Sequence, residues 1–399
     1  MISLPIYFSF DFGWIEIAFM ATAWFMLVLG LWPLSVLKRP RRRQLKLDSE
    51  IVSPPEGWPG ISVVVYCRDE ASSLERLLEK LFAQEYEGKY EIIVANDGQN
   101  AGIGDVVNRL NSRFGDMRVT FVPDGARSLS RRKMAFTLGI KAAKYDIVLL
   151  TCADTIVGSP KWIASVASQF VPEKDIVIGP AVPKRLYGRG LPRMMRRLDI
   201  ELITLTWISS ALHGKAFRGE GHNLAFRKQV FFDHKGYART LNLHYGDDDL
   251  FVNEISNKKN TAVNIRPEGL VKIDWRSPKH MLRDVSARRL YTSHGLGRGA
   301  RSLTSLLVWA TWLNFLAVVS AVAYSYSNGY VLCIAVSAFL ANWTIVSAGL
   351  SRAGKFLRLR MPMVWLVPSL MLRPLLTFKR RIRMMRIRST NFTWHKLPK

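Results

Sequence analysis

The stretch Ile147–Asp154 reads IVLLTCAD, and it decides how the rest of the chain is interpreted. Its first four residues are apolar, which is typical of a buried strand of an α/β sheet. Asp154 follows the carboxyl end of that strand, where open α/β sheets bind their ligands. A carboxylate in this place can hold a hard divalent cation, and the cation can hold a diphosphate. Taken alone, Asp154 fits equally well as an acid in the turn that ends a strand.

Two earlier stretches have the same organisation. Residues 61–70 (ISVVVYCRDE) and 90–98 (YEIIVANDG) each consist of an apolar run followed by acids, and leucines at helical spacing separate them. Strand, helix and strand in this order predict a right-handed parallel unit. We therefore expect Glu70, Asp97 and Asp154 to meet at one edge of a sheet. Together they suit a nucleotide, with its ribose, its base and a metal-bound diphosphate.

These motifs and their order resemble the nucleotide-sugar-dependent glycosyltransferases of family 2. The resemblance spans roughly residues 59–292 and is carried by RDE at 68–70, NDGQ at 96–99, KMAFTLGI at 133–140 and CAD at 152–154. It implies an α/β fold of the GT-A type, a Rossmann-like mixed sheet domain. It also implies that Glu70, Asp97 and Lys133 bind the donor, with Asp97 at the uracil or ribose. Asp154 would be the ligand of Mg²⁺ or Mn²⁺.

Cys152 departs from the family pattern. The family signature is Asp-x-Asp, and its first acid usually touches the ribose or a metal-bound water; here that position is a cysteine. A thiol makes this contact poorly, and sulfur suits zinc better than Mg²⁺ or Mn²⁺. We expect Cys152 to be a small buried neighbour that alters donor binding. A zinc ligand and a catalytically decayed enzyme are the alternatives.

Residues 218–228 read RGEGHNLAFRK, where two glycines let the backbone approach a ligand closely. The segment is similar to a strand on the acceptor side of the family. The resemblance therefore implies that Glu220, His222 and Asn223 lie on the acceptor side. A hairpin or bulge without ligand contact is the alternative.

Residues 246–251 read GDDDLF. Three adjacent carboxylates repel one another, so at least one pKa should rise, which is useful in a general base. The segment resembles the family motif whose last acid deprotonates the acceptor hydroxyl, and inversion needs one such base. We predict Asp248 as the base and Asp247 as the second candidate. An acidic helix N-terminus is the alternative, and Asp249 would then only complement the helix dipole.

Residues 286–294 read SARRLYTSH and stand where processive relatives have Gln-x-x-Arg-Trp. Only the arginine is kept, as Arg289, and its guanidinium would bind the donor diphosphate. The missing glutamine and tryptophan argue against a strictly processive polysaccharide synthase. A basic helix face at the membrane is the alternative for this segment.

Three apolar segments predict membrane helices. Residues 14–37 carry one charge, Glu16, and the cluster KRPRRR follows them at 38–43. The positive-inside rule places this cluster in the cytoplasm. Residues 306–324 and 330–350 predict a hairpin with both ends inside. Residues 361–378 are short and flanked by basic residues, which favours an interfacial or re-entrant helix, with a further span as the alternative.

Composition agrees with a membrane location. The net charge of +26 arises from basic residues that cluster beside the apolar segments, which suits anionic membrane lipids and not nucleic acid. The three cysteines are scattered and predict neither a disulfide framework nor a zinc site. We expect an N-terminal anchor (1–37), a linker (38–58), a cytoplasmic GT-A catalytic domain (59–300) and a C-terminal region with the membrane hairpin, the interfacial helix and a basic tail (301–399).

The predicted function is inverting transfer of a sugar, at the cytoplasmic face of the inner or plasma membrane. The donor would be a nucleoside-diphosphate sugar of the UDP type, and the acceptor a lipid, a lipid-linked glycan or a polysaccharide. Two alternatives stay open: a processive polysaccharide synthase that translocates its product, and a decayed, non-enzymatic scaffold subunit.

Overall fold

A computed structural model of the chain describes residues 6–386, apart from 48–49, 69, 99–100, 116, 124–129, 242, 244–245, 276–284, 286–288, 290–291, 293–295, 297–298 and 359–361. The chain forms two compact units. The first, here called the helical unit, contains residues 1–42, 188–209 and 298–378. The second, the sheet unit, contains residues 43–187, 210–297 and 379–399.

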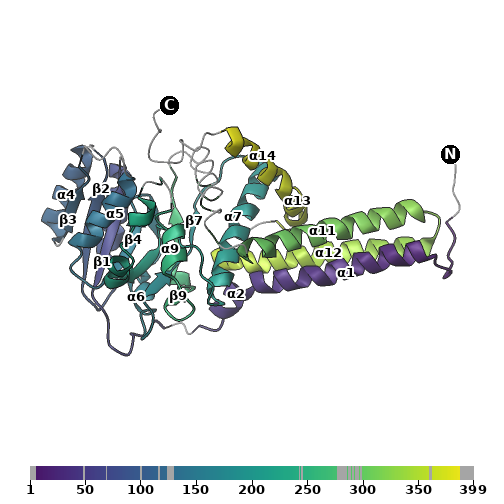
Figure 1. Cartoon of the computed structure of the whole chain (residues 1–399), viewed down its shortest axis with the longest axis horizontal. Coiled ribbons are helices and arrows are strands. Elements are labelled where there is room, and N and C mark those ends of the chain that lie inside the picture. Colours follow the sequence, from purple (N-terminus) through teal and green to yellow (C-terminus); the bar gives the residue numbers. More distant parts are fainter. Residues whose placement is uncertain are drawn as a thin grey trace. The chain divides into compact units, whose positions relative to one another are not determined.

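A mixed seven-stranded sheet forms the centre of the sheet unit (Figure 1). Its strands in spatial order are β3 (Met117–Phe121), β2 (Tyr90–Asn96), β1 (Ile61–Cys67), β4 (Ile147–Cys152), β8 (Leu224–Arg227), β6 (Ile176–Ile178) and β9 (Thr261–Val263). The first four strands are parallel, and β8 is antiparallel to both β4 and β6. A smaller sheet contains β5 (Thr155–Val157), β10 (Val271–Ile273) and β7 (Ala181–Pro183).

The strand register aligns the carboxyl ends of β1, β2 and β4. Cys67 pairs with Asn96, and Tyr66 pairs with Cys152. The apolar runs that predicted these strands are almost entirely buried, as strands covered on both faces require. The prediction of an α/β sheet with several acids at one edge is therefore confirmed.

Helices cover the sheet and bury their apolar residues against it. In α3 (Ala71–Phe82) the leucines at helical spacing are all buried. Gly139 of α5 (Arg131–Ala142) lies so close to β1 that an added Cβ would be 2.5 Å from Val64. Among the described residues the unit also contains α4 (Ala101–Phe114), α6 (Trp162–Ala167), α8 (Lys228–Asp233) and α9 (Asp249–Ile255), with 3₁₀ turns at Ala238–Thr240 and Pro267–Gly269.

The helical unit contains α1 (Trp14–Leu37), α11 (Gly299–Tyr324) and α12 (Gly329–Gly354), which run side by side (Figure 1). Among the described residues, three helical segments are long and apolar enough to cross a membrane: Trp14–Leu37, Leu303–Tyr324 and Gly329–Leu357. Ser325, just after α11, donates a hydrogen bond to Glu16 at the start of α1. Gly349 of α12 packs against Leu34 near the end of α1. Thus α11 is antiparallel to α1 and α12 is parallel to it, so the basic residues after α1 and at the end of α12 share one end of the bundle.

Residues 188–209 also belong to the helical unit, which the sequence did not predict. They form most of α7 (Gly190–Ala211). Asp199 of α7 is buried and accepts a hydrogen bond of 3.0 Å from Arg373 Nε at the start of α14 (Arg373–Arg386).

The C-terminal helices are short. Residues 362–386 form a 3₁₀ turn (Met363–Trp365), α13 (Leu366–Met371) and α14, and each is too short to span a bilayer. A short 3₁₀ turn at Lys355–Leu357 ends α12, and α2 (Arg39–Gln44) follows α1.

Candidate active site

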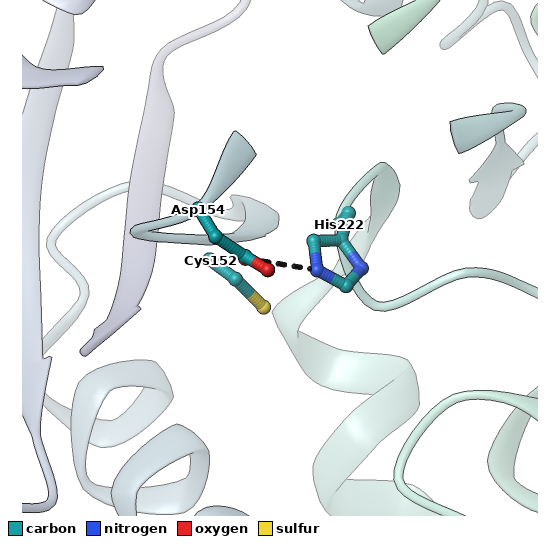
Figure 2. A group of neighbouring side chains, drawn as sticks. All are labelled: Cys152, Asp154 and His222. Carbon is teal, nitrogen blue, oxygen red and sulfur yellow. Dashed lines mark hydrogen bonds and ion pairs between the residues drawn. The ribbon is translucent and has the colours of Figure 1, made fainter. Parts of the chain in front are cut away.

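Cys152, Asp154 and His222 come together at the carboxyl end of β4. The antiparallel register of β4 and β8 pairs Ile147 with Arg227 and Leu150 with Leu224. Continued by two residues, this register sets Cys152 opposite His222. Figure 2 shows Cys152 and Asp154 extending toward the His222 ring, whose Nε2 is 3.1 Å from Asp154 Oδ1. One ligand atom from each of the three side chains lies within 4.8 Å of the others, so together they are able to hold a metal ion.

The charges around Asp154 and His222 shift the pKa values of both side chains. Burial alone would lower the pKa of His222, but the neighbouring Cys152 and Asp154 outweigh it and hold that pKa well above its usual range. Burial alone would raise the pKa of Asp154, but His222 and Arg132 lower it below its usual value. The neighbouring charges thus favour an ionised Asp154 beside a protonated His222, and a divalent cation would displace the imidazolium proton.

Asp97 lies at the end of β2 in a second polar cluster. Tyr66 donates its hydroxyl proton to Asp97 Oδ2 at 2.7 Å, and Arg131 Nε donates to Oδ1 at 2.7 Å. Burial and the charge of Asp97 raise the pKa of Tyr66 well above its usual value, so the phenol stays a donor. Glu70 stands at the start of α3, where the Leu74 amide donates to its carbonyl oxygen. The structure therefore places Glu70, Asp97 and Asp154 after three neighbouring strand ends.

Arg132 joins the parts of the site, and sequence reasoning missed it. Its Nε donates to Asp247 Oδ2 at 2.6 Å, and its Nη2 lies 3.4 Å from Cys152 Sγ. Its guanidinium carbon is 4.8 Å from the centroid of the Tyr66 ring and 5.3 Å from that of Phe136. The signal that was available is the basic run RRK at 131–133, which forms the first turn of α5, together with the acidic segment 247–249.

The three adjacent acids have different partners. Asp247 pairs with Arg132, and Asp249 is buried with Arg218 at 3.3 Å. Asp248 forms no ion pair among the described residues. Its Oδ1 accepts from the Asp249 amide at 2.7 Å, and its Oδ2 accepts from the Gly221 amide at 3.2 Å. Thus only Asp248 carries a charge that no arginine neutralises directly.

The turn before these acids depends on Gly246. Its φ is +94°, and an added Cβ would lie 2.5 Å from Leu250. A residue with a side chain would be strained here.

Burial, followed by repulsion from Asp247 and Asp249, raises the pKa of Asp248 to about 7. A carboxylate that titrates near neutral pH suits a general base.

The other residues expected to bind substrates have protein partners. Arg289 Nη2 lies 3.0 Å from Glu220 Oε1. The ammonium of Lys133 donates to the carbonyl oxygens of Thr240 and Leu243, and burial lowers its pKa to about 8. The contacts of Lys133 fix the backbone at Thr240 and Leu243. Of the segment 286–294, only Arg289 and Thr292 lie within the described residues, and Asp69 and Gln99 of the two early motifs lie outside them.

Asn223 was expected on the acceptor side, and it is buried within the fold. Its Nδ2 donates to the carbonyl oxygens of Pro180 and Gly269 at 3.2 and 2.7 Å, and its Oδ1 accepts from Trp162 Nε1 at 3.2 Å. These bonds fix the loop that carries Glu220 and His222. The expected substrate role of Asn223 has no contact of its own in support.

Comparisons with known proteins agree with this geometry. A family model described as "Glycosyltransferase like family 2" matches residues 59–259, just over half of the chain. An N-acetylglucosaminyltransferase of Mesorhizobium japonicum is 31% identical over 152 residues, 37% of this chain and 34% of that protein. A poly-β-1,6-N-acetyl-D-glucosamine synthase of Staphylococcus aureus is 31% identical over 98 residues, 25% of this chain and 22% of that protein.

Two further similarities are more distant in sequence. A hyaluronan synthase of Pasteurella multocida is 24% identical over 130 residues, 32% of this chain and 13% of that protein. The alignments with the N-acetylglucosaminyltransferase and the two synthases thus each cover about a third or less of that relative's own length. A solved mannosyltransferase of Pyrobaculum calidifontis, in complex with GDP-mannose and Mn²⁺, has a TM-score of 0.50 at 18% identity and covers 85% of this chain and 99% of that chain. This last likeness concerns the fold.

Proposed function

The chain belongs to glycosyltransferase family 2, with a GT-A fold, and from this premise we propose that it is an inverting, membrane-bound enzyme. It transfers a sugar from a nucleoside-diphosphate sugar, of the UDP type, to an acceptor hydroxyl. The acceptor is a lipid, a lipid-linked glycan or a polysaccharide. The sheet unit works at the cytoplasmic face of the inner or plasma membrane.

One observation carries the proposal: Asp248 has no cationic partner among the described residues, while Asp247 and Asp249 each have an arginine. Its pKa of about 7 leaves it largely ionised at slightly alkaline pH and able to accept a proton. Asp248 takes the acceptor hydroxyl proton while that oxygen bonds to the anomeric carbon. The bond from this carbon to the diphosphate breaks on the opposite face. Asp247 holds Arg132 beside the site and is the second candidate for the base.

The donor would lie along the strand ends. Asp97, held by Tyr66 and Arg131, faces the base or ribose, and Glu70 begins the neighbouring helix. Arg289 and Lys133 remain proposals as donor contacts, and Arg289 would have to exchange Glu220 for the diphosphate. Glu220 would then face the acceptor side, whereas His222, which the sequence assigned to the same side, would serve the cation site with Asp154.

A divalent cation fits the residues at the end of β4. Asp154 and His222 supply an oxygen and a nitrogen ligand within 3.1 Å of each other. The similar mannosyltransferase was solved with GDP-mannose and Mn²⁺, which supports a cation, Mg²⁺ or Mn²⁺, at this place. When bound, the cation neutralises the departing diphosphate.

The three apolar helices support an acceptor that reaches the active site from the membrane. The basic residues Lys38 to Arg43 at one end of α1, with Arg352 and Lys355 at the same end of the bundle, favour a cytoplasmic location and contact with anionic membrane lipids. No nucleic acid is required to account for this charge.

The relatives named hyaluronan synthase and poly-β-1,6-N-acetyl-D-glucosamine synthase favour a second candidate, a processive polysaccharide synthase. The third candidate, a decayed scaffold, has Cys152 in its support. The intact arrangement of Asp97, Asp154 and Asp248 argues against it.

The test uses the full-length protein in detergent. Nucleoside-diphosphate sugars are screened for thermal stabilisation with a divalent cation, and the best donor is then incubated with membrane lipid extract. We expect a single sugar transferred to a lipid or glycan, and loss of transfer in Asp248→Asn. Long polymers would favour the processive candidate. Binding without transfer or hydrolysis, with any cation, would favour the scaffold.

A further inference from the structure

Cys152 has a role that the proposed reaction does not assign. It ends β4, its side chain is 3% exposed, and the antiparallel register sets it opposite His222. Its Sγ lies 3.8 Å from the carbonyl oxygen of Gly221 and 3.4 Å from Arg132 Nη2. The thiol thus faces the same small space as Asp154 and His222 (Figure 2).

The geometry of these three side chains is close to that of a coordination sphere. Ligand atoms at bond lengths of ~2.0–2.3 Å in a tetrahedron are separated by about 3.5 Å. The Asp154 and His222 atoms are 3.1 Å apart, and all three ligand atoms lie within 4.8 Å of one another. Small side-chain rotations are therefore sufficient to place one ion in contact with all three.

We infer that Cys152 is a direct metal ligand, and that Cys152, Asp154 and His222 form a site that prefers Zn²⁺ or Co²⁺ to Mg²⁺ or Mn²⁺. The inference rests on the proposed function only in placing the donor diphosphate at the remaining coordination position. Sulfur and imidazole nitrogen favour these borderline cations, whereas Mg²⁺ prefers oxygen ligands and octahedral geometry. Three protein ligands and one open position are typical of zinc sites that bind a substrate.

The surroundings of the thiol fit this role better than that of a bystander. Binding of a metal removes the proton of a coordinating thiol, so the site must accommodate a charged sulfur. Arg132 is held by Asp247 and donates toward Sγ, which would stabilise that charge from outside the coordination sphere. The substitution of Cys152 for the usual acid therefore changes which cation is bound and keeps the site able to bind one.

The experiment replaces the metal with Co²⁺ and observes the thiolate directly. Full-length protein in detergent is stripped with a chelator and titrated with Co²⁺. A Co²⁺–thiolate bond gives a charge-transfer band in the near ultraviolet. Wild type is compared with Cys152→Ser, Cys152→Asp and the matched control Cys333→Ser, which removes an exposed thiol of α12. Displacement of Mn²⁺ by Zn²⁺ is followed by the electron paramagnetic resonance signal of free Mn²⁺.

We expect the band in wild type and Cys333→Ser, and its loss in both Cys152 variants. The preference for Zn²⁺ over Mn²⁺ should fall ~10-fold or more in Cys152→Asp, because changing even the outer partners of metal ligands alters metal affinity by about 10–100-fold. No band in the wild-type cobalt protein, or a band that persists in Cys152→Ser, would overturn the inference even where sugar transfer proceeds. A band that depends on Cys152, without sugar transfer under any condition, would leave the inference standing and reject the proposed function.

Discussion

Arg132 Nε lies 2.6 Å from Asp247 Oδ2, and this partly buried ion pair joins two segments that are 115 residues apart in the sequence. The other end of the guanidinium reaches Cys152, and its face covers the Tyr66 ring. One side chain thus connects Tyr66, Cys152 and the acidic segment, which the proposed function assigns to donor binding, the metal site and the base.

We predict that Arg132→Lys reduces sugar transfer about 100-fold, because misplacement of groups by about 1 Å has effects of this size. A lysine has no planar fork and cannot hold Asp247 and Cys152 at the same time. Steady-state kinetics should show the loss in kcat. The matched control is Arg227→Lys, since Arg227 forms a more exposed pair with Asp146. Equal activity of both variants and wild type would show that Arg132 does not position the site.

Asp248→Asn should reduce transfer by roughly 10²–10⁴-fold, the usual effect of losing a general base. UDP affinity should stay within a few-fold of wild type, because the base acts in the transition state. Single-turnover transfer and calorimetric UDP binding measure the two effects. Asp105→Asn, at an exposed position of α4, is the control. Normal transfer in Asp248→Asn together with loss in Asp247→Asn would assign the base to Asp247.

The raised pKa of Asp248 predicts that increasing pH raises the rate of sugar transfer and lowers the stability of the folded protein. Transfer should increase as pH rises through about 7, because only the ionised form accepts a proton. Stability should change the other way. The folded state binds this proton more tightly than the unfolded state, so the favourable contribution is full below the unfolded pKa near 4 and is lost as pH rises through about 7. Melting curves should show Asp248→Asn gaining stability relative to wild type above pH 7, and no gain at any pH would contradict the assignment.

Asp154→Asn should abolish cation-dependent donor binding. Removing a charged ligand should cost several kcal/mol of binding free energy, since contacts with charged groups are the strongest of their kind. Calorimetry of UDP with and without Mn²⁺, on both proteins, tests this. Unchanged metal dependence in the variant would exclude Asp154 as a ligand.

Glu201 on α7 predicts a pH effect in the helical unit. Both of its carboxylate oxygens are buried without a hydrogen-bond partner among the described residues, beside Gly354. Burial raises its pKa to about 8, so the favourable contribution of the protonated carboxyl is full below the unfolded value of about 4.5 and is lost as pH rises through about 8. Glu201→Gln should match wild type in thermal unfolding near pH 4 and exceed it by a growing margin up to about pH 9. An equal loss of stability with pH in both proteins would assign it to another group.

The sequence was sufficient for the features that depend on local pattern. Apolar runs predicted β1, β2 and β4, and the acids after them predicted Asp97 and Asp154 at one sheet edge, because strand ends follow directly from the chain. The long apolar segments likewise predicted α1, α11 and α12. The assignment of Asp248 as base remains a prediction, and the partners of its two neighbours add support to it.

The remaining features depend on contacts between distant segments. The antiparallel pairing of β8 with β4 sets His222 against Cys152, and no local pattern specifies that register. Lys133 matched a family motif, yet its ammonium bonds to carbonyl oxygens of the 240–243 segment. Asp249 had a helix N-terminus only as its alternative role, and it stands in the first turn of α9 while also pairing with Arg218. Each of these contacts joins segments that are distant in the sequence, so it is set only when the chain folds.

The order of helices in the bundle also constrains how the protein is made. Glu16 and Ala23 of α1 bond to Ser325 and Asn314, and Tyr7 exchanges backbone hydrogen bonds with residues 327 and 329. Some 260 residues separate the end of α1 from the start of α11. At ~5–20 residues per second, synthesis of α11 begins roughly 13–50 s after that of α1 ends. Residues 43–187 and 210–297 of the sheet unit are translated within that interval, so most of the proposed catalytic domain would be synthesised, and tethered by α1, before the C-terminal helices emerge.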